Sequence, residues 1–300
     1  MPAHPYTPES EQSRQLGEEL LRHSSIYADP ILPHGYGMES IAIIAAVARA
    51  RRHLISAYVL ADREDGLEAG LFLRAIFETA LLLGWLNEDP ELASLIWMLD
   101  DQRSTLQYDD QMRRIERNRR RRGRAAGEQI PPLGGSQTLG PLNRSSRRRY
   151  TAAVDDLERR IRALPDLRRR LKRLKPNSSP ANNKPIKITH INRMPGYDEQ
   201  AKVAGHGDLY ALTYSYDSRA VVHPSPLAME HFLESRPDGI VVHSEPTGAR
   251  PDPYAVGAAL LAMVLISASE QLPDFDLRQE AEALVPRLAV IQAAQRARMP

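Results

Sequence analysis

Apolar residues recur at helical spacing along most of the chain, and clusters of proline and glycine separate these runs. Three runs begin with a capping residue followed by proline, at Thr7-Pro8, Asp89-Pro90 and Asp252-Pro253, as helices often do. The pattern predicts helices over about residues 7–27, 39–61, 65–87, 89–112, 197–204, 208–223, 253–271 and 273–298.

Two short apolar runs, 229–235 and 240–245, flank the sequence Arg236-Pro237-Asp238-Gly239. A Pro-Asp-Gly turn between such runs is typical of a β-hairpin. We therefore expect a mainly α fold: a multi-helix bundle of about seven helices with one small β-hairpin.

Residues 71–86 form the most apolar stretch, in which only Arg74 and Glu78 are charged. A helix that is apolar all round is typical of a protein core, and sixteen residues fall short of a membrane span. The two charged residues are one turn apart, and burial of such a pair requires further polar partners. The pattern predicts a buried polar pocket with this helix as one wall. The uncharged run 253–269 is likewise better explained as a buried helix than as a membrane span.

The charge is distributed unevenly along the chain. Residues 113–175 hold 21 Lys and Arg against 6 Asp and Glu, and the remaining residues hold 19 against 32. We expect 113–195 to be a protruding Arg-rich helical hairpin with flexible linkers, its second helix broken at Pro165, inserted into a core made of 1–112 and 196–300.

A basic segment on an acidic body indicates RNA or another polyanion as the partner of residues 113–175. The arginines expected to contact phosphates include Arg117, Arg120, Arg148 and Arg169. The alternative is that the segment pairs with acidic residues of its own or a neighbouring subunit, as an assembly device. The apolar helix near the C-terminus also favours a homo-oligomer.

The amino-acid composition and the missing motifs exclude several kinds of functional site. Cysteine is absent, which excludes disulfides, thiolate zinc sites and a cysteine nucleophile. Nucleotide, metal and hydrolase motifs are missing, and the spacings of His206, His223, His231 and His243 match no metal-site pattern, so we expect no cofactor and no metal. The polar N-terminus does not resemble a signal peptide, and we expect a soluble, cytoplasmic protein without a membrane partner.

Polar residues concentrate on the predicted helix 208–223. Arg219 and His223 are one turn apart at its end, where the helix dipole favours a protonated histidine suited to acid catalysis or anion binding. The alternative is that His223 only caps the helix. Tyr210, Tyr214 and Ser218 share one face of this helix at steps of four residues, and Asp217 flanks that face.

Two separated motifs, Arg74-x-x-x-Glu78 and Tyr210…Tyr214…Ser218-x-x-x-x-His223-Pro224-Ser225, resemble a bacterial helical family known only as a domain of unknown function. The resemblance implies one polar pocket formed by Arg74, Glu78, Tyr210, Ser218 and His223. A weaker resemblance, carried by Arg219 and His223, is to the HEPN ribonucleases. It implies metal-independent cleavage, with the histidine in acid/base work and the arginine steadying the phosphate.

Three functions follow from these observations. The first is a nucleic-acid-directed protein, in its sharpest form a HEPN-like ribonuclease of a defence or toxin type with His223, Arg219, Arg74 and Glu78 in its catalytic site. The second is a pocket, binding or enzymatic, for an anionic small molecule. The third is a structural or assembly protein without catalysis.

Overall fold

A computed structural model describes residues 7–30, 37–63, 66–126, 141–181, 184–211, 233–237, 239–242 and 252–297. The fold is mainly α, as predicted. The chain divides into two compact units. Unit 1 comprises Met1–Glu88 with Tyr197–Pro300, and unit 2 comprises Asp89–Gly196. The predicted boundary at residue 113 therefore differs from the division in the structure, which lies at Asp89.

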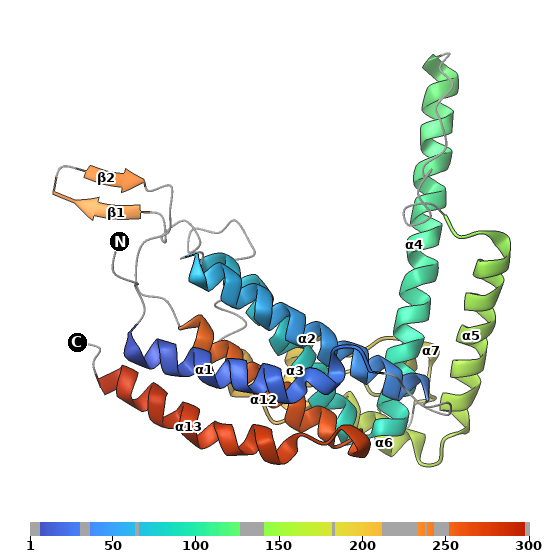
Figure 1. Cartoon of the computed structure of the whole chain (residues 1–300). Helices are drawn as coiled ribbons and strands as arrows, with labels where there is room; N and C mark the ends of the chain where they lie inside the picture. The colour runs from blue at the N-terminus through green and yellow to red at the C-terminus, as the bar shows by residue number, and fades with distance from the viewer. Residues whose placement is uncertain are drawn as a thin grey trace. The chain divides into compact units, whose positions relative to one another are not determined.

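Unit 1 is built from long helices. Its elements are α1 (Pro8–His23), η1 (Ser24–Tyr27), α2 (Met38–Asp62), α3 (Gly66–Glu88), α8 (Tyr197–Val203), α9 (Gly207–Leu209), β1 (Leu233–Arg236), β2 (Gly239–Val242), α12 (Pro253–Ser269), η4 (Pro273–Phe275) and α13 (Arg278–Ala297). The predicted cap of α1 is confirmed, because the Ser10 amide donates to Thr7 Oγ1 at 3.3 Å. The strands β1 and β2 pair antiparallel, with Leu233 opposite Val242 and Arg236 opposite Gly239 (Figure 1).

The core of unit 1 is centred on α12. This helix packs against α1, α2, α3 and α13, and 12 of its 17 residues are buried. Gly257 permits a close approach of α12 to α2, because a Cβ at this position would lie 2.4 Å from Leu54 Cδ1. The uncharged run of α12 is therefore a buried helix of unit 1.

The helix α3 packs against α2, α8 and α12. It is longer than the sixteen-residue stretch recognised in the sequence, and residues 68–88 are long and apolar enough to cross a membrane by length and composition alone. Half of that window is buried inside the protein.

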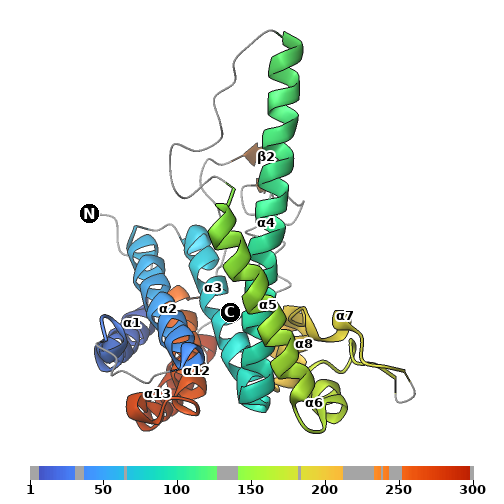
Figure 2. The same ribbon diagram turned by 90° about the vertical axis from the view of Figure 1, so that its right-hand side faces the viewer.

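Unit 2 contains a long antiparallel helix pair (Figure 2). Its helices are α4 (Pro90–Ala126), α5 (Arg144–Ala163), α6 (Leu167–Leu174) and α7 (Ile188–Ile191). The predicted break at Pro165 is confirmed. Leu164 is extended, as the residue before proline prefers, and Asp166 adopts a left-handed conformation at φ 51° before α6 begins. By contrast, α4 runs without interruption through residue 113.

Candidate functional site

The predicted pocket in unit 1 is described only in part. Arg74 and Glu78 form an ion pair on α3, with 3.0 Å between Nε and Oε1. Their side chains are 19% and 25% exposed, so the pair is half-buried, not enclosed in the core as predicted. The core-facing positions of α3 are filled by residues such as Leu73, Ile76 and Phe77, which leaves the side bearing Arg74 and Glu78 closer to the surface.

The second half of that pocket lies elsewhere in the chain. Tyr210 is half-buried at the end of α9. The remaining members, Tyr214, Asp217, Ser218, Arg219 and His223, lie outside the described residues. Their convergence with Arg74 and Glu78 stays a prediction. Within the residues that the structure describes, no three histidine, aspartate or glutamate side chains gather as metal ligands.

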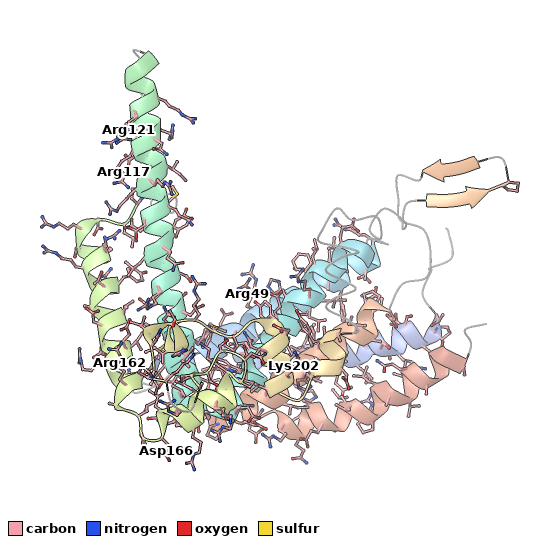
Figure 3. All side chains as sticks on the ribbon, turned by 180° about the vertical axis from the view of Figure 1, so that it is seen from behind. Arg49, Arg117, Arg121, Arg162, Asp166 and Lys202 are labelled. Atoms are coloured by element: carbon pink, nitrogen blue, oxygen red, sulfur yellow. The ribbon has the colours of Figure 1, made fainter. Side chains whose placement is uncertain are left out.

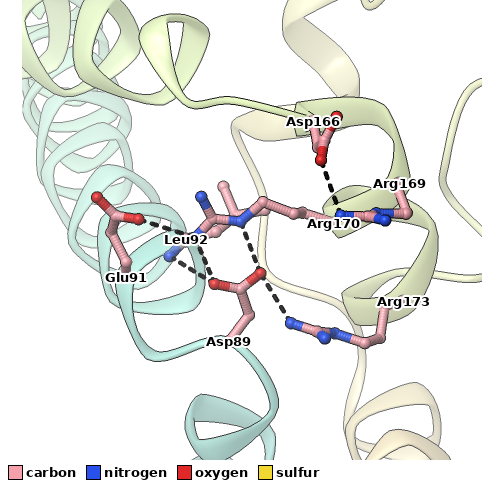
Figure 4. Close-up of polar contacts among 7 residues, drawn as sticks. All are labelled: Asp89, Glu91, Leu92, Asp166, Arg169, Arg170 and Arg173. Carbon is pink, nitrogen blue, oxygen red and sulfur yellow. Dashed lines mark hydrogen bonds and ion pairs between the residues drawn. The ribbon is translucent and has the colours of Figure 1, made fainter.

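In unit 2, the structure separates arginines that are paired with carboxylates from arginines that are not. The first pairing is at the start of α4 (Figure 4). Asp89, 6% exposed, accepts hydrogen bonds from Arg170 Nε at 2.8 Å and Arg173 Nη2 at 3.0 Å. Burial alone would raise the pKa of Asp89, but the hydrogen bonds from Arg170 and the Leu92 amide, with the charge of Arg173, hold it below its usual value. Asp89 thus caps α4 and binds α6 to it.

The second and third pairings follow along the antiparallel helices. Glu158 of α5 pairs with Arg103 of α4 and, at 3.5 Å, with Arg162. Further along, the carboxylate of Asp109 has no exposed surface and pairs with both Arg113 and Arg147. It also accepts a hydrogen bond at 2.7 Å from the backbone amide of Leu142, a residue that lies just before α5.

Asp109 is therefore the centre of a charged cluster between the two helices. The Arg113 Nε–Oδ2 distance is 2.9 Å, and Arg147 bridges to Asp110 at 2.7 Å. Burial would raise the pKa of Asp109, but its three donors outweigh burial and keep the pKa below the ordinary range. The carboxylate stays ionised at neutral pH and fixes both guanidinium groups.

A hollow opens beside this cluster. Its volume is about 660 Å³, and its lining contains Asp110, Arg113, Arg117, Leu142, Asn143, Arg144 and Arg147. Four of the seven lining residues are arginines, contributed by α4 and by the start of α5.

Beyond the hollow, α4 extends past the start of α5. The helix continues for thirteen residues after Arg113, to Ala126, a length of about 20 Å at the helical rise. Figure 3 shows Arg117 and Arg121 along this extension. Within the described part of the chain, Arg114, Arg117, Arg121 and Arg122 are exposed and have no ion pair. Arg120 pairs with Glu116.

These arginines are not spread evenly around α4. At 100° per residue, five of the seven arginines between positions 113 and 122 fall within an arc of about 120°. We call this arc the arginine face; its members are Arg113, Arg114, Arg117, Arg120 and Arg121. It begins at the hollow, which Arg113 and Arg117 line.

The four arginines expected to contact phosphates fall in different places. Arg117 and Arg120 belong to the arginine face. Arg148 is exposed on α5, and Arg169 of α6 is 84% exposed and pairs with Asp166 at 2.8 Å. Sequence reasoning missed Asp109, although the acidic pair Asp109-Asp110 directly before the arginine run was a visible signal.

Comparison with known proteins gave one family. The model of a family of unknown function, DUF5677, matches residues 40–240, about two thirds of the chain. No curated protein and no solved structure matched. The matched range contains both motifs that carried the resemblance to an uncharacterised family, which is confirmed, whereas the resemblance to HEPN ribonucleases gains no support. The chain belongs to the family of unknown function DUF5677.

Proposed function

We propose that this protein binds nucleic acid, with RNA as the expected partner, through the arginine face of α4. One observation carries the proposal: the last turns of α4 present exposed arginines that no carboxylate of the described chain neutralises, apart from Glu116 beside Arg120. Phosphate contacts by such residues supply most of the affinity for nucleic acid and release bound counterions. In this proposal, the basic end of α4 contacts the phosphates of the RNA.

The pairing elsewhere in unit 2 argues against a purely structural role for the free arginines. Acidic residues of unit 2 already hold the arginines that join its helices, through Asp89, Asp109 and Glu158. The arginines of the extension take no part in these pairings. An assembly function would instead make oligomeric state depend on Arg114 and Arg121, which size-exclusion chromatography with light scattering measures.

The test uses two charge-matched double variants. Arg114→Gln with Arg121→Gln removes two members of the arginine face that lie outside the hollow. The control, Arg159→Gln with Arg160→Gln, removes two exposed arginines of α5. Glu158, which precedes Arg159 in the chain, pairs with Arg103 of α4. Along α4, Arg103 lies about 27 Å from Arg121, so the control variant lies far from the arginine face. This distance exceeds the screening length of about 10 Å at 0.1 M salt.

Binding of a labelled single-stranded RNA is measured by fluorescence anisotropy. At about 50 mM salt, each lost phosphate contact should weaken binding by roughly tenfold. We therefore expect the Arg114/Arg121 variant to bind much more weakly and the control to bind like the parent. Absence of RNA binding at low salt, or equal losses in both variants, would contradict the proposal.

Cleavage of the bound RNA is a separate step of the proposal, and it rests on His223 and Arg219, with Arg74 and Glu78 orienting them. The same RNA incubated with the parent and with His223→Ala tests it. We expect intact RNA only with the variant. Equal cleavage by both, or none by either, removes the catalytic part and leaves the binding proposal standing.

A further inference from the structure

The hollow beside Asp109 has the size of a small-molecule site. Its volume of about 660 Å³ lies within the range of about 300–1,000 Å³ that is usual for ligand pockets. Its walls come from α4 and from the start of α5. The helix α5 spans 20 residues, long enough to have a substantial dipole. The positive end of the α5 dipole faces this region and favours an anion there.

The charged residues around the hollow indicate the charge of a ligand that would fit it. Four guanidinium groups line it, from Arg113, Arg117, Arg144 and Arg147. Two carboxylates oppose them: Asp110 in the lining and Asp109 directly behind Arg113 and Arg147. Four positive and two negative charges leave a net charge of +2. A dianion would balance it, whereas a phosphodiester carries a single charge.

Two of the four arginines are held in place before any ligand binds. Asp109 accepts from Arg113 and Arg147, and Arg147 also bridges to Asp110. Fixed donors lose little conformational entropy on binding. Arg117 and Arg144 are exposed and, within the described chain, have no ion pair, so their donors are available to an added anion. Guanidinium groups bind phosphate oxygens in pairs, which suits a group with three terminal oxygens.

We propose that this hollow binds a phosphate monoester, a group that carries a charge near −2 at neutral pH. The monoester is either the terminal phosphate of a nucleic-acid strand or that of a mononucleotide. The first source rests on the proposed function, because Arg113 and Arg117 belong both to the hollow and to the arginine face. A strand whose end occupies the hollow would place its following phosphates along α4.

The main test compares two RNAs of one sequence, one ending in phosphates and the other in hydroxyl groups. We expect the parent protein to bind the phosphorylated RNA at least tenfold more tightly. Arg144→Gln should remove most of this preference, because Arg144 lines the hollow without taking part in the ion pairs of the helices. The control is Arg149→Gln, an exposed arginine on the opposite side of α5, which should keep the preference. Equal affinity of the parent for both RNAs overturns the terminal-phosphate source.

A second arm separates failure of this inference from failure of the proposed function. Adenosine monophosphate and adenosine are titrated into the parent, Arg144→Gln and Arg149→Gln by calorimetry. Binding of the monophosphate alone, lost only in Arg144→Gln, supports the hollow even where RNA does not bind. If neither the RNA pair nor the nucleotide pair shows a phosphate preference that depends on Arg144, the inference is overturned.

Discussion

The buried carboxylate of Asp109 accepts a hydrogen bond at 2.9 Å from the guanidinium of Arg113, one turn further along α4. The same carboxylate holds Arg147 and the Leu142 amide, so one side chain joins α4 to the start of α5. The described arginines of unit 2 therefore fall into two groups. Some join helices through carboxylates, whereas Arg114, Arg117, Arg121 and Arg122, in the extension of α4, have no ion pair within the described residues.

Loss of the Asp109 carboxylate should destabilise unit 2. Asp109→Ala removes three hydrogen bonds and leaves Arg113 without an ion pair, whereas Arg147 keeps its pair with Asp110. Since these arginines are 39% and 37% exposed, water compensates part of the loss, and we expect about 2 kcal/mol, less than for a fully buried pair. Asp110→Asn, on a side chain 63% exposed, should change stability by less than about 0.5 kcal/mol. Urea unfolding measures both variants, and equal effects would show that Asp109 is not the centre of the cluster.

The lowered pKa values of Asp89 and Asp109 make the stability of unit 2 depend on acid pH. Both carboxylates lose their protons more readily in the folded state than in the unfolded state. Their stabilisation is therefore present above the unfolded-state pKa of about 3.9 and disappears as pH falls through the folded-state values. Hydrogen exchange in α4 and α5 should accelerate as pH is lowered toward 3, after correction for the intrinsic exchange rate. Asp109→Asn should weaken this pH dependence; an unchanged profile would contradict the assignment.

His53 should make unit 1 less stable below neutral pH. Its Nε2 accepts from Arg49 Nε at 3.1 Å, which requires a neutral ring. Burial, then the charges of Arg49 and Arg52, lowers the pKa of His53. As pH falls below the unfolded-state value of about 6.5, the unfolded chain takes up a proton first, so stability falls. Chemical unfolding at pH 7.5 and 5.5 checks this, and His53→Gln should reduce the difference.

A methyl group at Gly257 should destabilise the core of unit 1. A Cβ there would lie 2.4 Å from Leu54 Cδ1 and 3.1 Å from the Tyr58 ring, inside the core around α12. We expect Gly257→Ala to cost about 1–3 kcal/mol by overpacking. The control is Gly207→Ala, because the atom nearest to an added Cβ, Lys202 Cγ, lies 3.4 Å away, at an ordinary van der Waals distance. Thermal unfolding compares the two, and equal melting temperatures would contradict the packing of α12.

The half-buried Arg74–Glu78 pair should contribute little to stability. With side chains 19% and 25% exposed, the pair is partly screened by water, and we expect Glu78→Gln to cost less than about 1 kcal/mol. A buried structural pair would cost about 3–5 kcal/mol. Chemical unfolding measures the difference, and a loss in the larger range would return Glu78 to the structural role considered from sequence.

Local signals in the sequence predicted local structure well. The cap of α1 at Thr7 and the break at Pro165 could be predicted because each depends only on neighbouring residues. The end of α4 was harder to predict. The hydrophobic period stops near Met112, but the helix continues, since arginine is a good helix former and no proline intervenes before residue 126.

Features that depend on distant residues could not be predicted. Asp109 meets Arg147 only because α4 and α5 align antiparallel over their length, and the sequence does not fix that alignment. The depth of Arg74 was also hidden, because a helix apolar on all sides does not reveal which side lies nearer the surface. The predicted meeting of Arg74 with His223 stays a prediction, as residue 223 lies outside the described residues.

The dependence of RNA affinity on salt tests the central claim most directly. For single-stranded RNA, the logarithm of the binding constant falls with the logarithm of salt concentration by about 0.7 for each phosphate contact. Replacing Arg114 and Arg121 by glutamine should therefore reduce the slope by about 1.4, while the Arg159/Arg160 control keeps the parent slope. Identical slopes for all three proteins would show that the arginine face of α4 does not contact phosphates.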